Sequence, residues 1–105
     1  MKKHWIAAAA AACLPAWAAA QGAGQDALYV RALAATCANC HGTDGRPAEG
    51  GGLPALAGMP REYMLTQLRA FKAGTRQATI MHQLSKGYSD AQLEQLATYF
   101  AAQKR

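Results

Sequence analysis

A cysteine pair followed directly by a histidine is the most chemically specific feature of this sequence. Cys37-Ala38-Asn39-Cys40-His41 places two thiols three residues apart, about one helical turn, with an imidazole next to the second thiol. Each thiol can form a thioether with one vinyl group of a haem, and the imidazole then lies under the iron as an axial ligand. The motif therefore predicts one covalent haem c, attached through Cys37 and Cys40 and ligated by His41.

Two other chemistries use closely spaced cysteines. A thioredoxin-like redox disulfide occurs among alternating strands and helices, and this sequence has no strand pattern. A zinc site needs two further Cys or His ligands, and beyond the motif residues 21–105 offer only His82. Haem attachment is therefore favoured, and the His41 ring then needs a hydrogen-bond acceptor that fixes its tautomer.

The second axial ligand must come from elsewhere in the chain. Methionine is the usual soft, neutral ligand in an electron carrier, because it favours ferrous iron and raises the potential. Met64 lies inside a predicted helix, where a thioether usually packs in the core, and Met59 lies only 18 residues after His41. Met81, forty residues after His41 and between two predicted helices, is the preferred candidate. Met59, Met64 and His82 remain alternatives.

The first twenty residues have the layout of a secretory signal peptide. A short basic start precedes an apolar, alanine-rich run, and small residues at 18–20 predict cleavage between Ala20 and Gln21. The apolar run of about thirteen residues is interrupted by Pro15 and is shorter than the roughly 20 residues that span a bilayer. Lipoprotein processing before Cys13 is a weaker alternative. We expect a periplasmic protein with one domain over 21–105 and no membrane span after processing.

The charge of residues 21–105 is mildly basic. Nine Lys and Arg against six Asp and Glu are spread along the predicted helices, without the basic run typical of nucleic-acid binding. Most of these side chains are expected on a solvated surface. Five of them could form a basic rim that steers an acidic partner: Arg46, Arg61, Lys72, Arg76 and Lys86.

The apolar periodicity predicts an all-α fold. A first helix is expected over 26–36 with Asp26 as its N-cap, and a glycine-rich irregular loop over 42–58. Pro60 and Gly74 should bound a second helix, and a short helical turn should cover 80–85. Ser89 begins a capping box before a last helix, whose predicted buried positions are Leu93, Leu96, Ala97 and Phe100.

Several of these segments together resemble a small bacterial class I cytochrome c. They are CANCHG at 37–42, PALAG at 54–58, Met81, and a last helix that begins at Ser89-Asp90 and carries Tyr99-Phe100. The resemblance covers nearly all of 21–105. It implies three to four helices wrapped round one haem, with the first and last helices crossing at Tyr99 and Phe100. It also implies His41 and Met81 as axial ligands and the Pro54 carbonyl as acceptor of the His41 ring N–H. The implied haem-pocket residues are Leu56, Leu65, Leu68 and Ile80, although each would also fit an ordinary core.

A narrower resemblance lies in the second half of the chain. The runs AFKAG at 70–74, ATIM at 78–81 and SKGYS at 85–89 are similar to the cytochrome subunit of flavocytochrome c sulfide dehydrogenases. That family implies a haem subunit that accepts electrons from an exported, sulfide-oxidising flavoprotein and is not itself catalytic. Some members carry two haem domains, whereas this sequence has one motif. A free-standing carrier for a terminal oxidase or reductase is the alternative, and an open-site haem protein that binds a small gas or peroxide is a third hypothesis.

Overall fold

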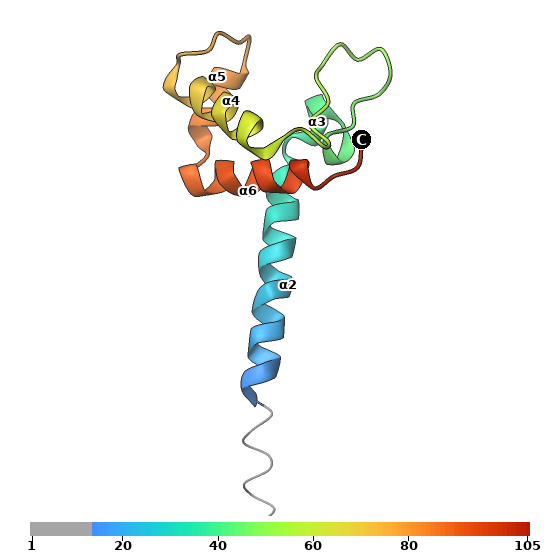
Figure 1. Ribbon diagram of the computed structural model, residues 1–105, viewed down its shortest axis with the longest axis vertical. Helices are drawn as coiled ribbons and strands as arrows, with labels where there is room; N and C mark the ends of the chain where they lie inside the picture. Colours follow the sequence, from blue (N-terminus) through green and yellow to red (C-terminus); the bar gives the residue numbers. More distant parts are fainter. Residues whose placement is uncertain (1–13) are drawn as a thin grey trace, which may run out of the picture.

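The computed structural model describes residues 14–105, and every regular element in that range is helical (Figure 1). The α-helices are α2 (Leu14–Ala35), α3 (Ala38–His41), α4 (Arg61–Ala73), α5 (Met81–Leu84) and α6 (Asp90–Ala101), with 3₁₀ turns η1 (Thr43–Gly45) and η2 (Ser85–Gly87). The all-α prediction is confirmed. Over residues 14–105, no helix combines the length and apolar character needed to cross a bilayer.

Helix α6 begins and packs as its sequence predicts. The Ser89 hydroxyl accepts a hydrogen bond from the Gln92 backbone N–H at 3.1 Å, and the Gln92 side chain accepts one from the Ser89 N–H at 2.9 Å. This reciprocal pair satisfies N–H groups that the first helical turn leaves unpaired. The four predicted inward positions, Leu93, Leu96, Ala97 and Phe100, are all buried.

Helix α4 also has the predicted bounds. Pro60 is its N-cap, and Gly74 ends it in the left-handed conformation at φ 77°, where its N–H bonds to the carbonyls of the last turn. A side chain at such a φ would be strained, so glycine suits this position. Leu65 is buried on α4, while Leu68 and Phe71 are half-buried. The Arg76 guanidinium lies over the Phe71 ring, 4.6 Å from its centre.

The predicted start of the first helix was wrong. Helix α2 begins at Leu14 rather than at Asp26, and it ends one residue early, at Ala35. The stretch before Asp26 is rich in alanine, the strongest helix former, and this outweighs Gly22 and Gly24. The N-terminal half of α2 leads away from the other helices (Figure 1). The predicted cleavage point lies within α2, and most of the predicted signal peptide falls outside the described residues.

The core forms where α2, α4 and α6 meet. Helix α2 crosses α6, and α4 packs along α6 (Figure 1). The Tyr99 and Phe100 rings are in edge-to-face contact near this crossing, with centres 5.3 Å apart. The buried cluster comprises Ala34, Met64, Leu65, Leu93, Leu96, Ala97 and Phe100. The helix crossing implied by the resemblance is therefore present.

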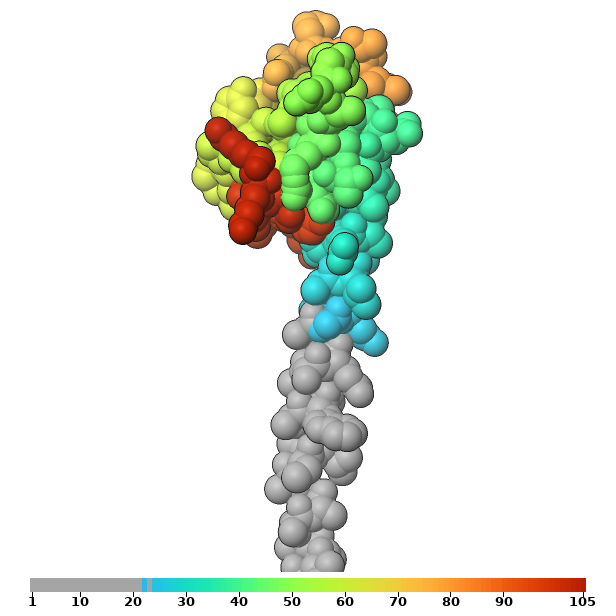
Figure 2. Space-filling view, turned by 90° about the vertical axis from the view of Figure 1, so that its right-hand side faces the viewer, coloured from blue at the N-terminus to red at the C-terminus, as the bar shows by residue number. Residues whose placement is uncertain are grey.

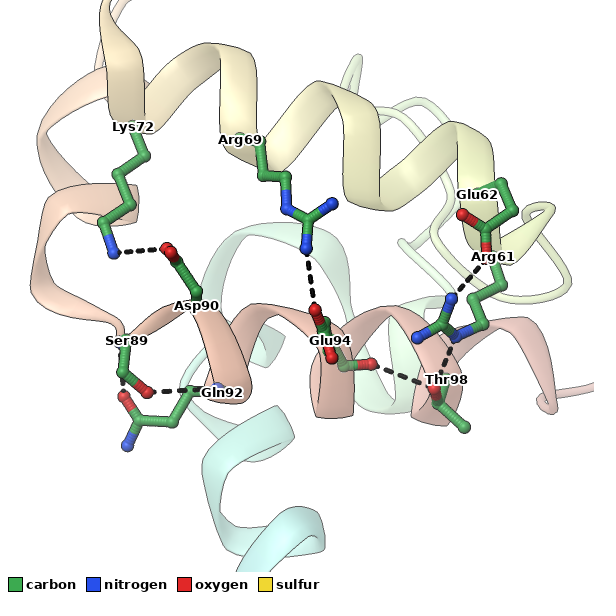
Figure 3. Close-up of polar contacts among 9 residues, drawn as sticks. All are labelled: Arg61, Glu62, Arg69, Lys72, Ser89, Asp90, Gln92, Glu94 and Thr98. Atoms are coloured by element: carbon green, nitrogen blue, oxygen red, sulfur yellow. Dashed lines mark hydrogen bonds and ion pairs between the residues drawn. The ribbon is translucent and has the colours of Figure 1, made fainter.

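A row of polar contacts joins α4 to α6 on the surface (Figure 3). Lys72 pairs with Asp90 at 2.9 Å, Arg69 pairs with Glu94 at 2.7 Å, and Arg61 donates to the Thr98 hydroxyl at 2.9 Å. Exposed ion pairs each contribute about 0–1 kcal/mol, so the row sets the register of the two helices more than it stabilises them. Two of the five predicted rim charges, Arg61 and Lys72, are thus already engaged within the chain.

Candidate functional site

The CANCH motif forms a single helical turn at the end of α2. Cys37 caps helix α3, and its carbonyl accepts a hydrogen bond from the His41 backbone N–H at 2.9 Å. The two cysteines, three residues apart, therefore lie within one helical turn, as the spacing predicts. The two thiols are not bonded to each other. Cys37 is half-buried against the hydrophobic core, whereas Cys40 is exposed.

The surroundings of Cys37 argue against a redox-active thiol. Burial raises the pKa of the Cys37 thiol, and the neighbouring Cys40 raises it further. A nucleophilic or disulfide-exchanging cysteine instead needs a lowered pKa, from a cation or a helix of appreciable length. This environment therefore disfavours a thioredoxin-like role for Cys37.

The His41 ring is buried and oriented by one hydrogen bond. The side chain is 8% exposed, and its Nδ1 lies 2.9 Å from the Pro54 carbonyl oxygen. A carbonyl oxygen can only accept, so Nδ1 carries the proton and the Nε2 lone pair is available to a metal. This is the contact that the resemblance implies, and it is the usual arrangement of a metal-ligating histidine. The donor set of two thiols and one oriented imidazole therefore fits a haem c.

Backbone hydrogen bonds fold the loop over 42–58 so that Pro54 reaches His41. The Gly45 carbonyl accepts from the Leu56 and Ala57 N–H groups at 2.8 and 3.1 Å, and the Gly58 N–H donates to the Phe100 carbonyl at 2.9 Å. Gly42 turns the chain directly after the motif at φ 78°, where a Cβ atom would lie 1.9 Å from the Arg46 carbonyl oxygen. Only glycine fits this close backbone approach.

Asp44 and Tyr99 join this loop to the last helix. The Tyr99 hydroxyl donates to the Asp44 carboxylate at 2.5 Å, and Asp44 has the left-handed φ of 53° that Asp tolerates better than most residues. The hydrogen bond to Asp44, followed by burial, raises the pKa of Tyr99. This pair leaves no signal in the sequence, because 55 positions separate the two residues.

The four candidates for the second axial ligand lie in different surroundings. Met81 is half-buried as the first residue of α5. Met64 is 3% exposed within the core cluster, as expected for a packing residue. Met59 is half-buried beside a groove that Arg46 and Arg105 also line. His82 is half-buried, and its Nδ1 has no hydrogen-bond partner among the described residues.

The implied pocket residues divide into two groups. Leu65 belongs to the buried core, and Leu56 and Leu68 pack against it. Ile80, in contrast, is 54% exposed. The loop over 46–54 and the segment over 75–85 both lie at the end of the molecule away from the N-terminal half of α2 (Figures 1 and 2). These segments hold the exposed apolar side chains Leu53, Ile80 and Leu84, which a porphyrin could cover.

Comparisons with known proteins show which family this chain resembles. The family model described as Cytochrome c matches residues 29–104. The chain is 42% identical over 71 residues to the "Thiosulfate dehydrogenase electron acceptor" of Thiomonas intermedia. It is 40% identical over 68 residues to the "Cytochrome subunit of sulfide dehydrogenase" of Chlorobaculum tepidum. It is 42% identical over 80 residues to cytochrome c4 of Pseudomonas aeruginosa.

These matches cover most of this chain but less of the relatives. They include 68%, 65% and 75% of this chain and span 33%, 60% and 39% of the three relatives. A solved structure of Acidithiobacillus ferrooxidans cytochrome c4 matches with a TM-score of 0.58 and 41% identity, over 63% of this chain and 38% of that one. The matched range of the family model contains the CANCH motif, Pro54 and Met81.

Proposed function

The chain belongs to the cytochrome c family, and from this premise we propose that it transfers single electrons through a haem ligated by His41 and Met81. Its fold is the class I cytochrome c fold. Membership implies covalently bound haem c, and a single haem fits the size of the chain. The hydrogen bond between the His41 ring and the Pro54 carbonyl carries the proposal most directly, because it prepares Nε2 to bind iron.

Each residue of the site has a separate task in this proposal. When bound, the haem supplies a one-electron Fe(III)/Fe(II) couple. Cys37 and Cys40 would hold it covalently, and His41 would ligate the iron while the Pro54 carbonyl fixes the His41 ring. The Met81 thioether is a neutral ligand that favours the reduced state. If His41 and Met81 both bind the iron, substrates would have no access to it, so the expected role is electron transfer rather than catalysis.

The absorption spectrum tests this ligation. We expect the processed protein to be heavier than its polypeptide by one haem, and low-spin when ferric, with a near-infrared methionine–iron band. The reduced protein should not bind carbon monoxide. A high-spin ferric spectrum with carbon monoxide binding would support an open-site haem protein. A colourless protein with two alkylatable thiols, made together with the cytochrome maturation machinery, would refute haem attachment altogether.

Replacing Met81, the proposed second axial ligand, tests the ligation more sharply. Met81→Ala should leave the haem attached, abolish the near-infrared band and lower the reduction potential, because the ligand that favours ferrous iron is lost. Met64→Leu is the matched control, since that methionine is buried in the core and should affect stability alone. If the band survives in Met81→Ala, the ligand is Met59 or Met64. A low-spin original protein that lacks the band would instead indicate His82.

For the partner, we propose an exported flavoprotein that oxidises sulfide and passes its electrons to this cytochrome. The support is the runs at 70–74, 78–81 and 85–89 and the 40% identity to a protein named as the cytochrome subunit of sulfide dehydrogenase. A free-standing carrier is the alternative, which the likeness to cytochrome c4 favours. Attachment of haem c outside the cytoplasm and the predicted signal peptide both agree with a periplasmic location.

Purification from the native source distinguishes the two partner hypotheses. A permanent subunit should elute with a flavin-containing protein, and sulfide should reduce its haem in the purified complex. A free carrier should elute alone and accept electrons only when a separate dehydrogenase is added. Elution alone, with no reduction by sulfide in any fraction, would refute the sulfide dehydrogenase assignment while leaving haem ligation intact.

A further inference from the structure

The Tyr88 hydroxyl makes a contact that has no role in the proposed haem attachment or ligation. Tyr88 directly follows η2, at the end of the segment that begins with Met81, and its hydroxyl lies 2.7 Å from the Thr36 hydroxyl. Thr36 in turn immediately precedes Cys37. We infer that Tyr88 is a positioning residue that fixes the Met81 segment to the haem-attachment turn and so keeps Met81 on the iron. This inference rests on the proposed ligation by Met81.

Proton counting fixes the direction of this hydrogen bond. The Thr36 hydroxyl also lies 2.7 Å from the Leu33 carbonyl oxygen, which can only accept. Thr36 therefore donates its one proton to Leu33, and the Tyr88 hydroxyl donates to the Thr36 oxygen. The result is a relay from the Met81 segment to the last turn of α2, which positions the backbone that leads into Cys37.

The backbone and the ring of Tyr88 are also fixed by contacts. Its carbonyl accepts a hydrogen bond from the Lys72 ammonium group at 2.7 Å, and the same ammonium group pairs with Asp90. Its ring packs against the hydrophobic core, as Cys37 also does. Because ring and backbone are fixed, the hydroxyl reaches Thr36 with little further loss of side-chain freedom.

This contact is the one side-chain hydrogen bond, among the described residues, that joins the segment 81–88 to the segment 36–41. The two segments carry the two proposed ligands. Without this contact, the Met81 segment would still be tied to α4 through Lys72, but not to the haem-attachment turn. A ligand on a loosened segment is displaced more readily by a ligand from solution, because the competing state costs less free energy.

Imidazole binding to the ferric holoprotein measures this directly. In Tyr88→Phe, we expect the affinity for imidazole, followed by loss of the near-infrared band, to rise about fivefold, the equivalent of one hydrogen bond of about 1 kcal/mol. Thr36→Val should raise it similarly, and Thr36→Ser, which keeps the hydroxyl, should restore nearly the original affinity. The double variant Thr36→Val/Tyr88→Phe should rise no further than either single variant.

A second tyrosine supplies the matched control. The Tyr29 hydroxyl accepts a hydrogen bond from the Gln92 side chain at 2.8 Å, which joins α2 to α6 and involves no residue of 81–88. Tyr29→Phe should affect stability without changing imidazole affinity. If Tyr88→Phe binds imidazole as the original protein does, the positioning role is refuted. If the near-infrared band is absent from the original protein or survives in Met81→Ala, the ligand assignment itself fails.

Discussion

The orientation of His41 shows how one residue of the site depends on another that is distant in sequence. The carbonyl of Pro54 accepts the Nδ1 proton, which leaves Nε2 as the free nitrogen. Pro54 can do this because backbone hydrogen bonds to Gly45 hold the loop in place. Cys37 shows a similar dependence, since burial against the core raises the pKa of its thiol.

Loss of one attachment thiol should prevent maturation. In Cys40→Ala we expect haem-containing protein to fall to a small fraction of the normal yield, because one thioether no longer anchors the porphyrin beside His41. Absorbance per mole of purified protein measures this. Cys13→Ala is the control, since that cysteine belongs to the predicted signal peptide and should not affect yield. Normal haem content in Cys40→Ala would contradict the attachment argument.

The hydrogen bond between Tyr99 and Asp44 should make stability pH-dependent in alkaline solution. Because Asp44 raises the pKa of Tyr99 in the folded state, the unfolded chain loses this proton first as the pH rises. The contribution is therefore complete below about pH 10, the ordinary tyrosine pKa, and is lost progressively above it. Urea unfolding of Tyr99→Phe should show a loss of about 1 kcal/mol near neutral pH and a weaker decline above about pH 10. An equally steep alkaline decline in this variant would show that another group is responsible.

At the level of elements, the helix ends are set by local signals, and α6 is the clearest case. Its capping box satisfies backbone groups at Ser89 and Gln92, and its buried positions repeat at helical spacing. Helix α4 is bounded in the same way by Pro60 and Gly74. These signals involve residues only a few positions apart, so they can be recognised in the sequence. Asp26 resembles such a signal but lies inside α2, so the predicted start of that helix was wrong.

Removing the cap of α6 should weaken the fold without altering the haem environment. Ser89→Ala should lower the free energy of unfolding by about 1 kcal/mol, because the Gln92 N–H loses its acceptor. Ser89→Thr should retain most of the stability, since it keeps the hydroxyl. Urea unfolding measures both variants, and the near-infrared band should be unchanged in each. A loss of the band in Ser89→Ala would mean that the cap also positions Met81.

At the level of the whole molecule, some basic side chains are paired within the chain and others are left available to a partner. The row between α4 and α6 engages Arg61, Arg69 and Lys72 within the chain (Figure 3). Of the predicted rim charges, Arg76 is held by Gln67 and by the Phe71 ring. Among residues 14–105, the Lys86 ammonium group hydrogen-bonds only to the Gln83 amide oxygen. Lys86 is therefore a better candidate than Lys72 for steering a partner.

The domain should not need the first residues that follow the predicted cleavage point. Residues 24–29 of α2 are exposed, and Ala34 is the first residue of α2 in the buried cluster. A chain processed to begin at Gln25 instead of Gln21 should therefore unfold within about 0.5 kcal/mol of the longer form. Mass spectrometry would verify each N-terminus, and urea unfolding would compare them. A loss well above about 1 kcal/mol would show that 21–24 belong to the folded domain.

The sequence by itself determined the chemistry of the haem motif, the all-helical class and most helix bounds. Each of these depends on residues a few positions apart, such as the two thiols of the motif or the capping box of α6. Only the tertiary structure decided which methionine is buried, how the loop over 42–58 presents Pro54, and that Asp44 meets Tyr99 and Thr36 meets Tyr88. The last two pairs are 55 and 52 positions apart. Contacts of this kind leave no local period or spacing, because they arise only when separate helices pack together.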